Sequence, residues 1–330
     1  MKKKRKNLSL WLFIIGAFII MIPQIRILYN EIIREYDLYQ YQNQINQVTI
    51  EEREILLEEM REQRHTVEQV ASNNQQVSNL EMNYIDPFSV IEDEEGKTFS
   101  SSKFPNNMLG YIVIPKIGER LPIYIGATDY HLSLGTATVE GASVPGGGPG
   151  THSVISGHRG YAGANYFRHI DLLKEGDLIE LHILNEILLY AVTGNAIISP
   201  YDSSSLKIVE GEDLLTLLSC HPYRVNNQRI LIYAKRVPSK ETQSSLLSNY
   251  QNLVASTSNI SSYELYEKKE GTDFTGKNIL DIIVKFLDPS LERAVRKELL
   301  FNRLIIVLCL FAILGAFSMI YKNNHIKNKK

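Results

Sequence analysis

The sequence predicts a mainly β domain, a closed barrel or a sandwich, with helices before and after it. Seven short runs rich in β-branched residues lie between residues 107 and 238, with turn residues separating them. Short helices fit between these runs near 129–134 and 165–173. A long polar stretch without proline or glycine precedes the β-rich region, and an apolar run lies near each end of the chain. A length of 330 residues allows one large domain or two of ordinary size.

The N-terminal segment 1–28 has the pattern of a membrane anchor. Its first six residues, MKKKRK, carry five positive charges, and the apolar run from Leu8 to Ile22 follows at once. Extended to Leu28, the run reaches the length of about 20 residues that a spanning helix needs. A basic start followed by an apolar run is also typical of a cleaved signal peptide, which remains the alternative.

The C-terminal end predicts a second membrane segment. Residues 304–321 are uncharged and apolar, and the tail 322–330 is basic. The positive-inside rule places both basic ends in the cytoplasm, so two crossings put the chain between them outside the cell membrane. The net charge of −2, without a basic patch among aromatic residues, argues against a nucleic-acid partner.

The remaining boundaries follow changes in composition. Residues 29–83, rich in Gln, Glu and Arg, predict a stalk of one or two solvated helices that holds the domain off the membrane. Residues 84–106 contain proline and serine and predict a loop. The β domain occupies 107–238. Residues 239–303 begin as a Ser-, Asn-, Lys- and Glu-rich linker and end in a juxtamembrane helix.

The run TLLSCHPYRVNNQR contains Cys220, the one cysteine outside the apolar segments. Cys309 lies within the C-terminal apolar run, so Cys220 has no partner for an intrachain disulfide. Such a thiol is buried and inert, paired with another molecule, or reactive. A metal site with His221 is disfavoured, because successive strand residues point to opposite faces and no second cysteine or HExxH pair completes it.

A reactive thiol needs a proton carrier and a cation beside it. His158 ends a β-rich run in VISGHRGY, where two glycines allow the chain to turn and expose the ring. Arg229 begins a strand nine residues after Cys220, so pairing of antiparallel neighbours would bring it to the thiol. Four other histidines lie in strand, helix or stalk patterns and are expected to be structural or at the surface: His65, His152, His169 and His182.

The run SGHRG, followed about sixty residues later by TLLSCHPYRVNNQR, resembles the sortase signature Thr-Leu-x-Thr-Cys-x-x-Tyr-x-x-Asn-x-x-Arg. The Cys, Tyr, Asn and Arg positions all stand at the expected intervals. Ser219 and His221 depart from the residues that are usual there, which affects fine specificity more than the reaction. The resemblance covers Leu109 to about Val237 and implies a closed β-barrel of the sortase type.

Within this family, the sequence is similar to the pilin-polymerising sortases, class C. That group has a C-terminal membrane segment and a lid before the barrel that carries an Asp-Pro-aromatic tripeptide, which Asp86-Pro87-Phe88 matches. An ordinary turn is the alternative interpretation of this tripeptide, because Asp-Pro favours turns in any protein.

The resemblance also implies a mechanism that needs no metal or cofactor. Cys220 attacks the Thr–Gly carbonyl of an LPxTG-like sorting signal on a pilin subunit and forms a thioacyl enzyme. His158 protonates the leaving amine and then deprotonates the incoming one, and Arg229 stabilises the oxyanion. An amine from a pilin lysine or a cell-wall precursor completes the transfer. At rest, Asp86 pairs with Arg229 and Phe88 covers Cys220.

Other functions remain open on the sequence. The enzyme could attach surface proteins to peptidoglycan, as housekeeping sortases do, or act as a secreted cysteine peptidase that hydrolyses the intermediate. A membrane-anchored adhesin or scaffold domain would tolerate loss of the thiol. The run GGGPGTH is not a phosphate loop because no GK[ST] follows it, and no G-x-S-x-G elbow is present.

Overall fold

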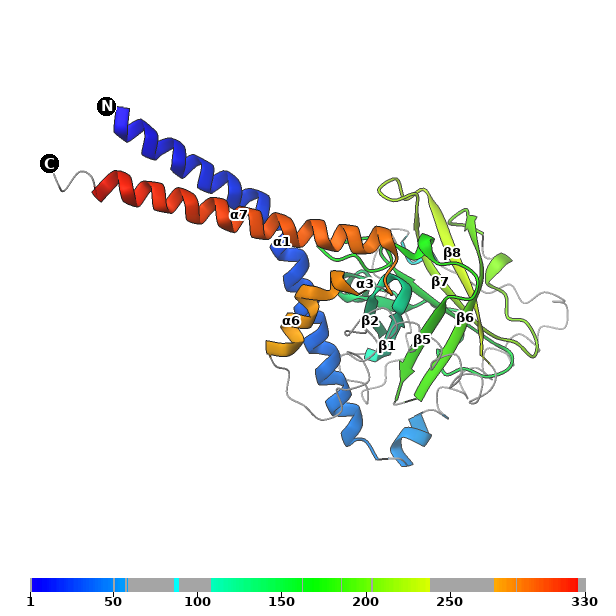
Figure 1. Cartoon of the computed structure of the whole chain (residues 1–330). Helices are drawn as coiled ribbons and strands as arrows, with labels where there is room; N and C mark the ends of the chain where they lie inside the picture. Colours follow the sequence, from blue (N-terminus) through cyan, green and yellow to red (C-terminus); the bar gives the residue numbers. More distant parts are fainter. Residues whose placement is uncertain are drawn as a thin grey trace.

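A closed barrel of eight strands forms the centre of the protein and confirms the predicted mainly β fold (Figure 1). Neighbouring strands follow the order β1-β2-β3-β4-β7-β8-β6-β5. The computed structural model describes residues 2–49, 51–56, 58, 86–88, 108–161, 163–184, 186–202, 204–237, 276–288 and 290–325.

The predicted β-rich runs form seven of the eight strands. The strands are β1 (Met108–Ile114), β2 (Glu119–Tyr124), β3 (Thr136–Thr138), β4 (Thr151–Gly157), β5 (Leu178–Ile183), β6 (Glu186–Ile198), β7 (Asp213–His221) and β8 (Gln228–Arg236). The helical elements are α1 (Lys2–Gln47), η2 (Pro115–Ile117), α3 (Asp129–Leu134), η3 (Ile170–Leu172), η4 (Ser204–Leu206), α6 (Gly276–Val284), η5 (Lys285–Leu287) and α7 (Arg293–His325).

Two local expectations inside the barrel domain need correction. The predicted helix over 165–173 is a series of turns that ends in the short 3-10 helix η3. The strand β3, only three residues long, was not predicted, yet it closes the barrel by pairing parallel to β2 and antiparallel to β4. The other short helix, at 129–134, is confirmed as α3, and the Thr128 hydroxyl caps it by accepting from the backbone N–H of His131.

The N-terminal helix packs along the barrel where a solvated stalk was expected. α1 continues from the apolar segment to Gln47 without a break, and Leu38, Tyr41 and Ile45 are buried in the main hydrophobic core. The Tyr41 hydroxyl donates a 2.7 Å hydrogen bond to the carbonyl of Leu109 in β1. These apolar residues recur at helical spacing, so this face of α1 packs against the outside of the barrel at β1. The predicted stalk beyond residue 58 lies outside the described residues.

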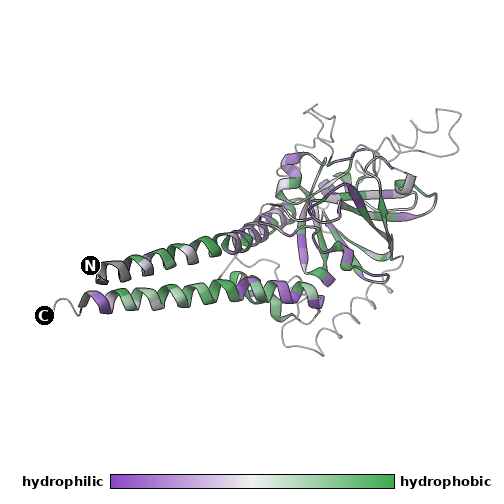
Figure 2. Cartoon of the chain, turned by 90° about the horizontal axis from the view of Figure 1, so that it is seen from above, coloured by the Kyte–Doolittle hydropathy of each residue, from purple (hydrophilic) through white to green (hydrophobic). Residues whose placement is uncertain are grey.

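The two apolar segments form an antiparallel pair of helices. Figures 1 and 2 show α1 and α7 side by side, projecting away from the barrel with both termini at the far end and mostly hydrophobic surfaces. The two helices share a hydrophobic cluster made by Ile14, Ala17, Met21, Ile313, Ala316 and Ile320. Both are long and apolar enough to cross a membrane by length and composition. The predicted segment 304–321 lies wholly within α7, which begins earlier at Arg293.

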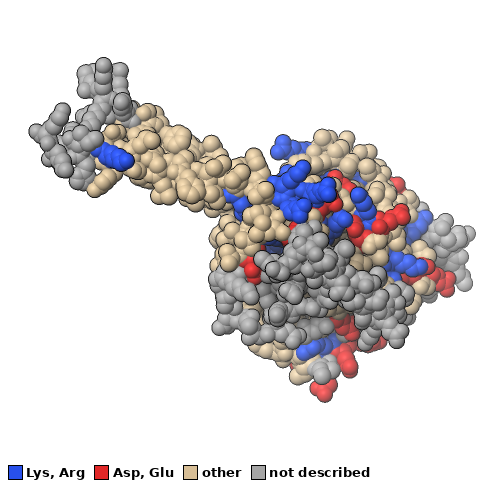
Figure 3. Space-filling view, viewed as in Figure 1, with Lys and Arg blue, Asp and Glu red and all other residues tan. Residues whose placement is uncertain are grey.

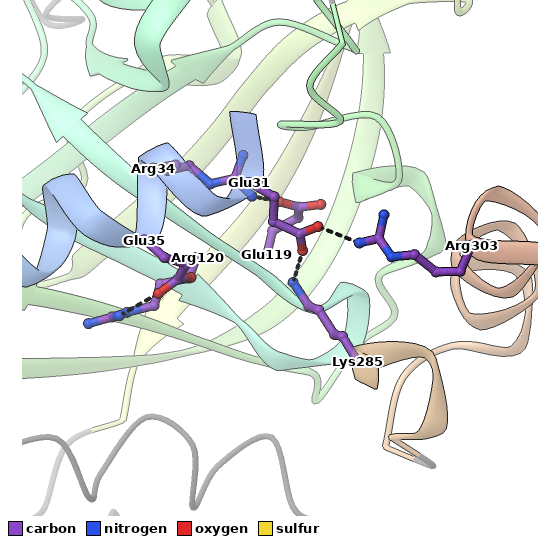
Figure 4. A network of polar contacts seen from close by, with 7 residues as sticks. All are labelled: Glu31, Arg34, Glu35, Glu119, Arg120, Lys285 and Arg303. Carbon is purple, nitrogen blue, oxygen red and sulfur yellow. Dashed lines mark hydrogen bonds and ion pairs between the residues drawn. The ribbon is translucent and has the colours of Figure 1, made fainter. Parts of the chain in front are cut away.

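Buried ion pairs fasten this helix pair to the barrel (Figure 4). Glu31 of α1 accepts from Lys285 at 3.2 Å and from Arg303 of α7 at 2.8 Å. One helical turn further, two more pairs join α1 to β2: Arg34 with Glu119 at 3.4 Å, and Glu35 with Arg120 at 3.0 Å. Figure 3 shows charged side chains gathered where the pair meets the barrel, whereas the projecting part has an almost uncharged surface on this face.

Candidate active site

The strand ladder places Cys220 beside Arg229. β7 and β8 pair antiparallel, and Cys220 lies directly opposite Arg229 in the register, as the sequence predicted. Both residues are nearly buried, with exposed fractions of 7% and 4%. The Arg229 guanidinium also donates from Nη1 to the carbonyls of Asn226 and Gln228, at 3.0 and 2.8 Å, which fixes it at the start of β8. A cation is therefore held at the position that the predicted chemistry requires.

His158 reaches the same end of the barrel from β4. β4 runs parallel to β7, and the last backbone pair of this ladder is Ser156 with Leu218. His158 follows β4 by one residue, and Cys220 is the next-to-last residue of β7, so both lie just beyond that pair. The predicted set of His158, Cys220 and Arg229 is thus brought together by two adjacent ladders.

Gly157 leaves room for Phe167 and Thr136 at the end of β4. A Cβ atom at this position would lie 2.9 Å from a ring carbon of Phe167 and 3.1 Å from a methyl of Thr136. The carbonyl of Gly157 accepts a 2.7 Å hydrogen bond from the buried Ser219 hydroxyl. Ser219 departs from the threonine of the sortase signature, yet it keeps the hydroxyl that makes this contact.

Aromatic rings enclose the imidazole of His158. The Tyr161 ring stacks on it with centroids 4.7 Å apart and an interplanar angle of 10°. The Phe88 ring approaches it at 5.5 Å with a tilt of 47°. Phe88 also lies under the guanidinium of Arg229, 5.3 Å from the ring centroid to Cζ. The aromatic residue of the predicted lid therefore contacts both proposed partners of the thiol.

Asp86 forms the predicted ion pair with Arg229. Its Oδ1 accepts from Nε at 2.7 Å, and its Oδ2 accepts from Nη2 at 2.6 Å, an arrangement in which two parallel bonds add specificity. Both side chains are about 95% buried. Of the predicted lid segment 84–106, only residues 86–88 are among the described residues.

The electrostatics of the resting site favour neutral groups. Burial raises the pKa of the Cys220 thiol above its ordinary value, an effect that Arg229 opposes and Asp86 reinforces. Burial also lowers the pKa of the His158 imidazole, and Asp129 offsets this only in part. At neutral pH the closed site therefore holds a thiol and a neutral imidazole, and opening of the lid would remove part of the burial that opposes charge on both.

His221 faces away from the thiol, as strand alternation predicted. Its Nδ1 accepts a 2.6 Å hydrogen bond from Nη1 of Arg159, so this nitrogen carries no proton. The described residues contain no group of three or more His, Cys, Asp or Glu side chains that could hold a metal ion.

The other described histidines named from the sequence have structural contacts. His152 is buried, with Nε2 2.7 Å from the Thr216 hydroxyl oxygen. His182 stacks on Tyr111, with ring centroids 4.5 Å apart. His169 lies 3.1 Å from Glu298 of α7. None of them contacts Cys220 or Arg229. His65 lies outside the described residues.

Sequence reasoning missed the residues that surround the predicted set. Tyr161 and Arg159 each stand within three residues of a predicted catalytic residue, but their types carry no chemical signature of their own, and Ser219 was noted only as a departure from the signature. Asp171, which pairs with Arg159 at 2.7 Å, lies in the segment that had been predicted as an ordinary helix. Adjacency in the sequence could have suggested Tyr161, Ser219 and Arg159, but no local pattern points to Asp171.

Comparisons with known proteins agree with this geometry. A family model described as the sortase domain matches residues 112–237. Sortase A of Bacillus anthracis is 28% identical over 162 residues, which cover 48% of this chain and 74% of that protein. Sortase C1 of group B Streptococcus pilus island 1 matches with a TM-score of 0.55 at 27% identity, over 62% of this chain and 98% of that one.

A second solved structure extends the match. Sortase C of Streptococcus pneumoniae matches with a TM-score of 0.50 at 31% identity, covering 62% of this chain and 97% of that chain. Together with the domain match across the barrel and the meeting of a cysteine, a histidine and an arginine at one end of it, this likeness shows that the chain belongs to the sortase family of cysteine transpeptidases.

Proposed function

We propose that this protein is a membrane-anchored class C sortase that cleaves an LPxTG-like sorting signal between Thr and Gly and joins the new carboxyl end to a pilin lysine. The observation that carries this proposal is the contact of Asp86 and Phe88 with Arg229 and His158, which makes the tripeptide a lid over the site. The apolar helix α7 after the barrel adds support. So do the solved relatives, one of which comes from a pilus island.

In the proposed reaction, Cys220 is the nucleophile. Its sulfur attacks the Thr carbonyl carbon, the Thr–Gly bond breaks, and a thioester forms. His158 takes the thiol proton, delivers it to the departing glycine amine, and later removes one from the acceptor amine and returns it to the sulfur. That amine then attacks the thioester, which forms an amide bond and releases the thiol.

Arg229 is proposed to stabilise the oxygen that becomes negative during both steps. Because Asp86 occupies Nε and Nη2 at rest, the lid must open before the substrate can use these donors. In comparable sites, one such donor lowers the barrier by about 3 kcal/mol. The same arginine thus links lid opening to catalysis.

The proposed orientation places the barrel outside the cell membrane with both termini in the cytoplasm. The basic runs beyond the two apolar segments support it, as does the antiparallel pairing of α1 with α7, which puts both ends on one side. Substrates would then be pilin subunits that carry C-terminal sorting signals on the outer face.

The deciding experiment offers the full-length protein in detergent micelles a fluorescent LPxTG peptide together with two competing acceptors. One acceptor is a folded pilin domain with its lysine, and the other is a peptidoglycan stem-peptide amine. Mass spectrometry should find the peptide joined to the lysine. Transfer mainly to the stem peptide would favour the housekeeping alternative, and free acid despite abundant amine would favour a peptidase.

A Cys220→Ala variant is the matched control. It should give no product with either acceptor. Unchanged product formation by this variant would show that Cys220 is not the nucleophile. A wild-type protein without any cleavage activity would favour the scaffold alternative.

A further inference from the structure

The guanidinium of Arg159 is buried and fully engaged between three partners. Nη1 donates to Nδ1 of His221 at 2.6 Å, and Nη2 pairs with Oδ2 of Asp171 at 2.7 Å. Nε donates to the carbonyl of Arg168 at 3.3 Å. Only 5% of the Arg159 side chain is exposed. A buried cation with this many partners holds its surroundings in one arrangement, because each lost contact would leave a donor unpaired.

The place of this contact in the sequence is informative. Arg159 directly follows His158, and His221 directly follows Cys220. The Arg159–His221 contact joins residues that are 62 apart, which is the spacing of every pair in the β4–β7 ladder. It therefore continues the register of the two strands beyond their last backbone pair.

A second contact continues the same register on the other side of the catalytic pair. The hydrogen bond from Ser219 to Gly157 also joins residues 62 apart. His158 and Cys220 have this spacing too, and they lie between the two side-chain contacts. Side-chain hydrogen bonds therefore join the ends of β4 and β7 on both sides of His158 and Cys220.

We propose that Arg159 is a positioning residue, which keeps the ends of β4 and β7 in register through His221 and Asp171 so that His158 remains opposite Cys220. This inference rests on the proposed function, since the register matters only if the histidine and the thiol react together. Arg159 touches neither substrate nor sulfur in this account, although its charge also lowers the pKa of the Cys220 thiol. It acts on the geometry of the two neighbouring residues.

The contact with His221 is sensitive to protonation. Nδ1 can accept from Arg159 only while it carries no proton, and a charged imidazole would repel the guanidinium. Among the described residues, the charged groups that face His221 are Arg159 and, behind it, Asp171. Burial and the Arg159 cation lower the pKa of His221, so the contact persists at neutral pH and is lost only on acidification.

The test measures kcat and KM for sorting-peptide cleavage with the full-length protein in detergent. Arg159→Ala should lower kcat by about tenfold or more with KM nearly unchanged, because a small misplacement of reacting groups has large effects on rate. Arg159→Lys should recover part of the loss, since an ammonium can keep the ion pair with Asp171. Arg293→Ala, at an exposed position of α7, is the matched control and should leave kcat unchanged.

Two substitutions at the half-exposed His221 provide an independent comparison. His221→Asn offers an amide oxygen near the position of Nδ1 and should stay close to the wild-type rate, whereas His221→Ala should lower kcat several-fold, to about a fifth. The Asn variant should also shift the acidic limb of the kcat–pH profile, because its acceptor does not titrate. A purely structural role of Arg159 would not move this limb.

Three results would overturn the inference: an Arg159→Ala variant with kcat within twofold of wild type, equal rates for His221→Ala and His221→Asn, or an acidic limb that is identical in His221→Asn. If Arg159→Ala fails to fold, the two His221 variants decide alone. Failure of the proposed function is distinguishable, because Cys220→Ala and His158→Ala would then cleave as well as the wild type.

Discussion

Asp86 and Arg229 are 143 residues apart in the sequence, yet two hydrogen bonds of 2.7 and 2.6 Å join them in the buried end of the barrel. The arginine that is proposed to bind the substrate carbonyl is therefore already occupied. Phe88, two residues along the chain, lies against the same guanidinium and against the ring of His158. Proline between them restricts the backbone, so Asp86 and Phe88 move as one unit.

Removal of both lid side chains should make the thiol more reactive. In the double variant Asp86→Ala, Phe88→Ala, we expect alkylation of Cys220 to be at least about tenfold faster, because the wild-type lid can open only by breaking a buried ion pair. Cleavage of short sorting peptides should rise with it. The measurement is the rate of iodoacetamide modification of the Cys220 peptide by mass spectrometry, with the Cys309 peptide as an internal reference. An unchanged alkylation rate of Cys220 would show that Asp86-Pro87-Phe88 is an ordinary turn and not a lid.

The neighbouring histidines should behave differently on substitution. Cys220→Ala and His158→Ala should each abolish peptide cleavage, because one removes the nucleophile and the other the proton carrier. His221→Thr should retain most of the activity, since the threonine hydroxyl can still accept from Arg159. Single-turnover kinetics of the three variants would check this. An essential His221 with a dispensable His158 would contradict the proposed base.

Charge removal at the lid should change the pH dependence of thiol modification. Burial raises the pKa of Cys220, and the Asp86 carboxylate raises it further. In Asp86→Asn, the midpoint of the alkylation–pH curve should therefore move to lower pH, because Arg229 then faces the thiolate without a competing anion. Asp202→Asn, which changes a half-exposed carboxylate elsewhere, serves as the comparison. A midpoint that rises or stays in place would contradict the electrostatic account of the lid.

The side of the membrane on which the barrel lies can be tested on intact protoplasts. Added protease should digest the barrel and spare the tail KNNHIKNKK, which can be followed with an epitope placed after Lys330. Lysed protoplasts, in which both parts are accessible, provide the control. Protection of the barrel would overturn the external placement and the class of substrates with it.

The buried ion pairs at the base of the barrel should contribute strongly to stability. Glu31→Ala leaves Lys285 and Arg303 without this carboxylate in a buried position, at a cost of about 3 kcal/mol. Thermal unfolding in detergent should show a lower Tm, and Glu51→Ala, an exposed glutamate, should leave Tm unchanged. A Tm equal to the wild type would show that the ion pairs contribute little.

The same carboxylate gives stability a pH dependence. Burial alone would raise the pKa of Glu31, but Lys285 and Arg303 hold it below its ordinary value in the folded protein. A depressed pKa stabilises the fold at neutral pH, and this stabilisation is lost as the pH falls through the folded-state pKa. The Tm difference between wild type and Glu31→Ala should therefore shrink on acidification.

Much of the barrel follows directly from the sequence. The runs that became β4, β6, β7 and β8 are continuous β-rich segments between turn residues, so periodicity and composition were sufficient. β3 was missed because three residues carry no periodic pattern. Pairing of Cys220 with Arg229 could be predicted because a short loop between adjacent strands fixes the register.

Contacts between distant segments were beyond sequence reasoning. Leu38, Tyr41 and Ile45 have helical spacing, but the polar residues around them favoured a solvated helix, and only the presence of β1 explains their burial. The partners of Glu31 come from segments more than 250 residues away, so no local pattern links them. The contacts of Arg159 were equally hidden, since the parallel ladder brings His221 to it from 62 residues away.

The antiparallel pairing of α1 and α7 has a consequence for how substrates are met. A single membrane helix would leave the barrel free to rotate and tilt. Two helices joined by a shared hydrophobic cluster and buried ion pairs hold the barrel in one orientation relative to the membrane. If both helices are embedded as proposed, the enzyme diffuses in two dimensions within the membrane. Encounters with other membrane-borne chains then depend on lateral diffusion and on the height of the catalytic end above the lipid. Effective concentration, rather than affinity for the sorting peptide, would decide which substrates react.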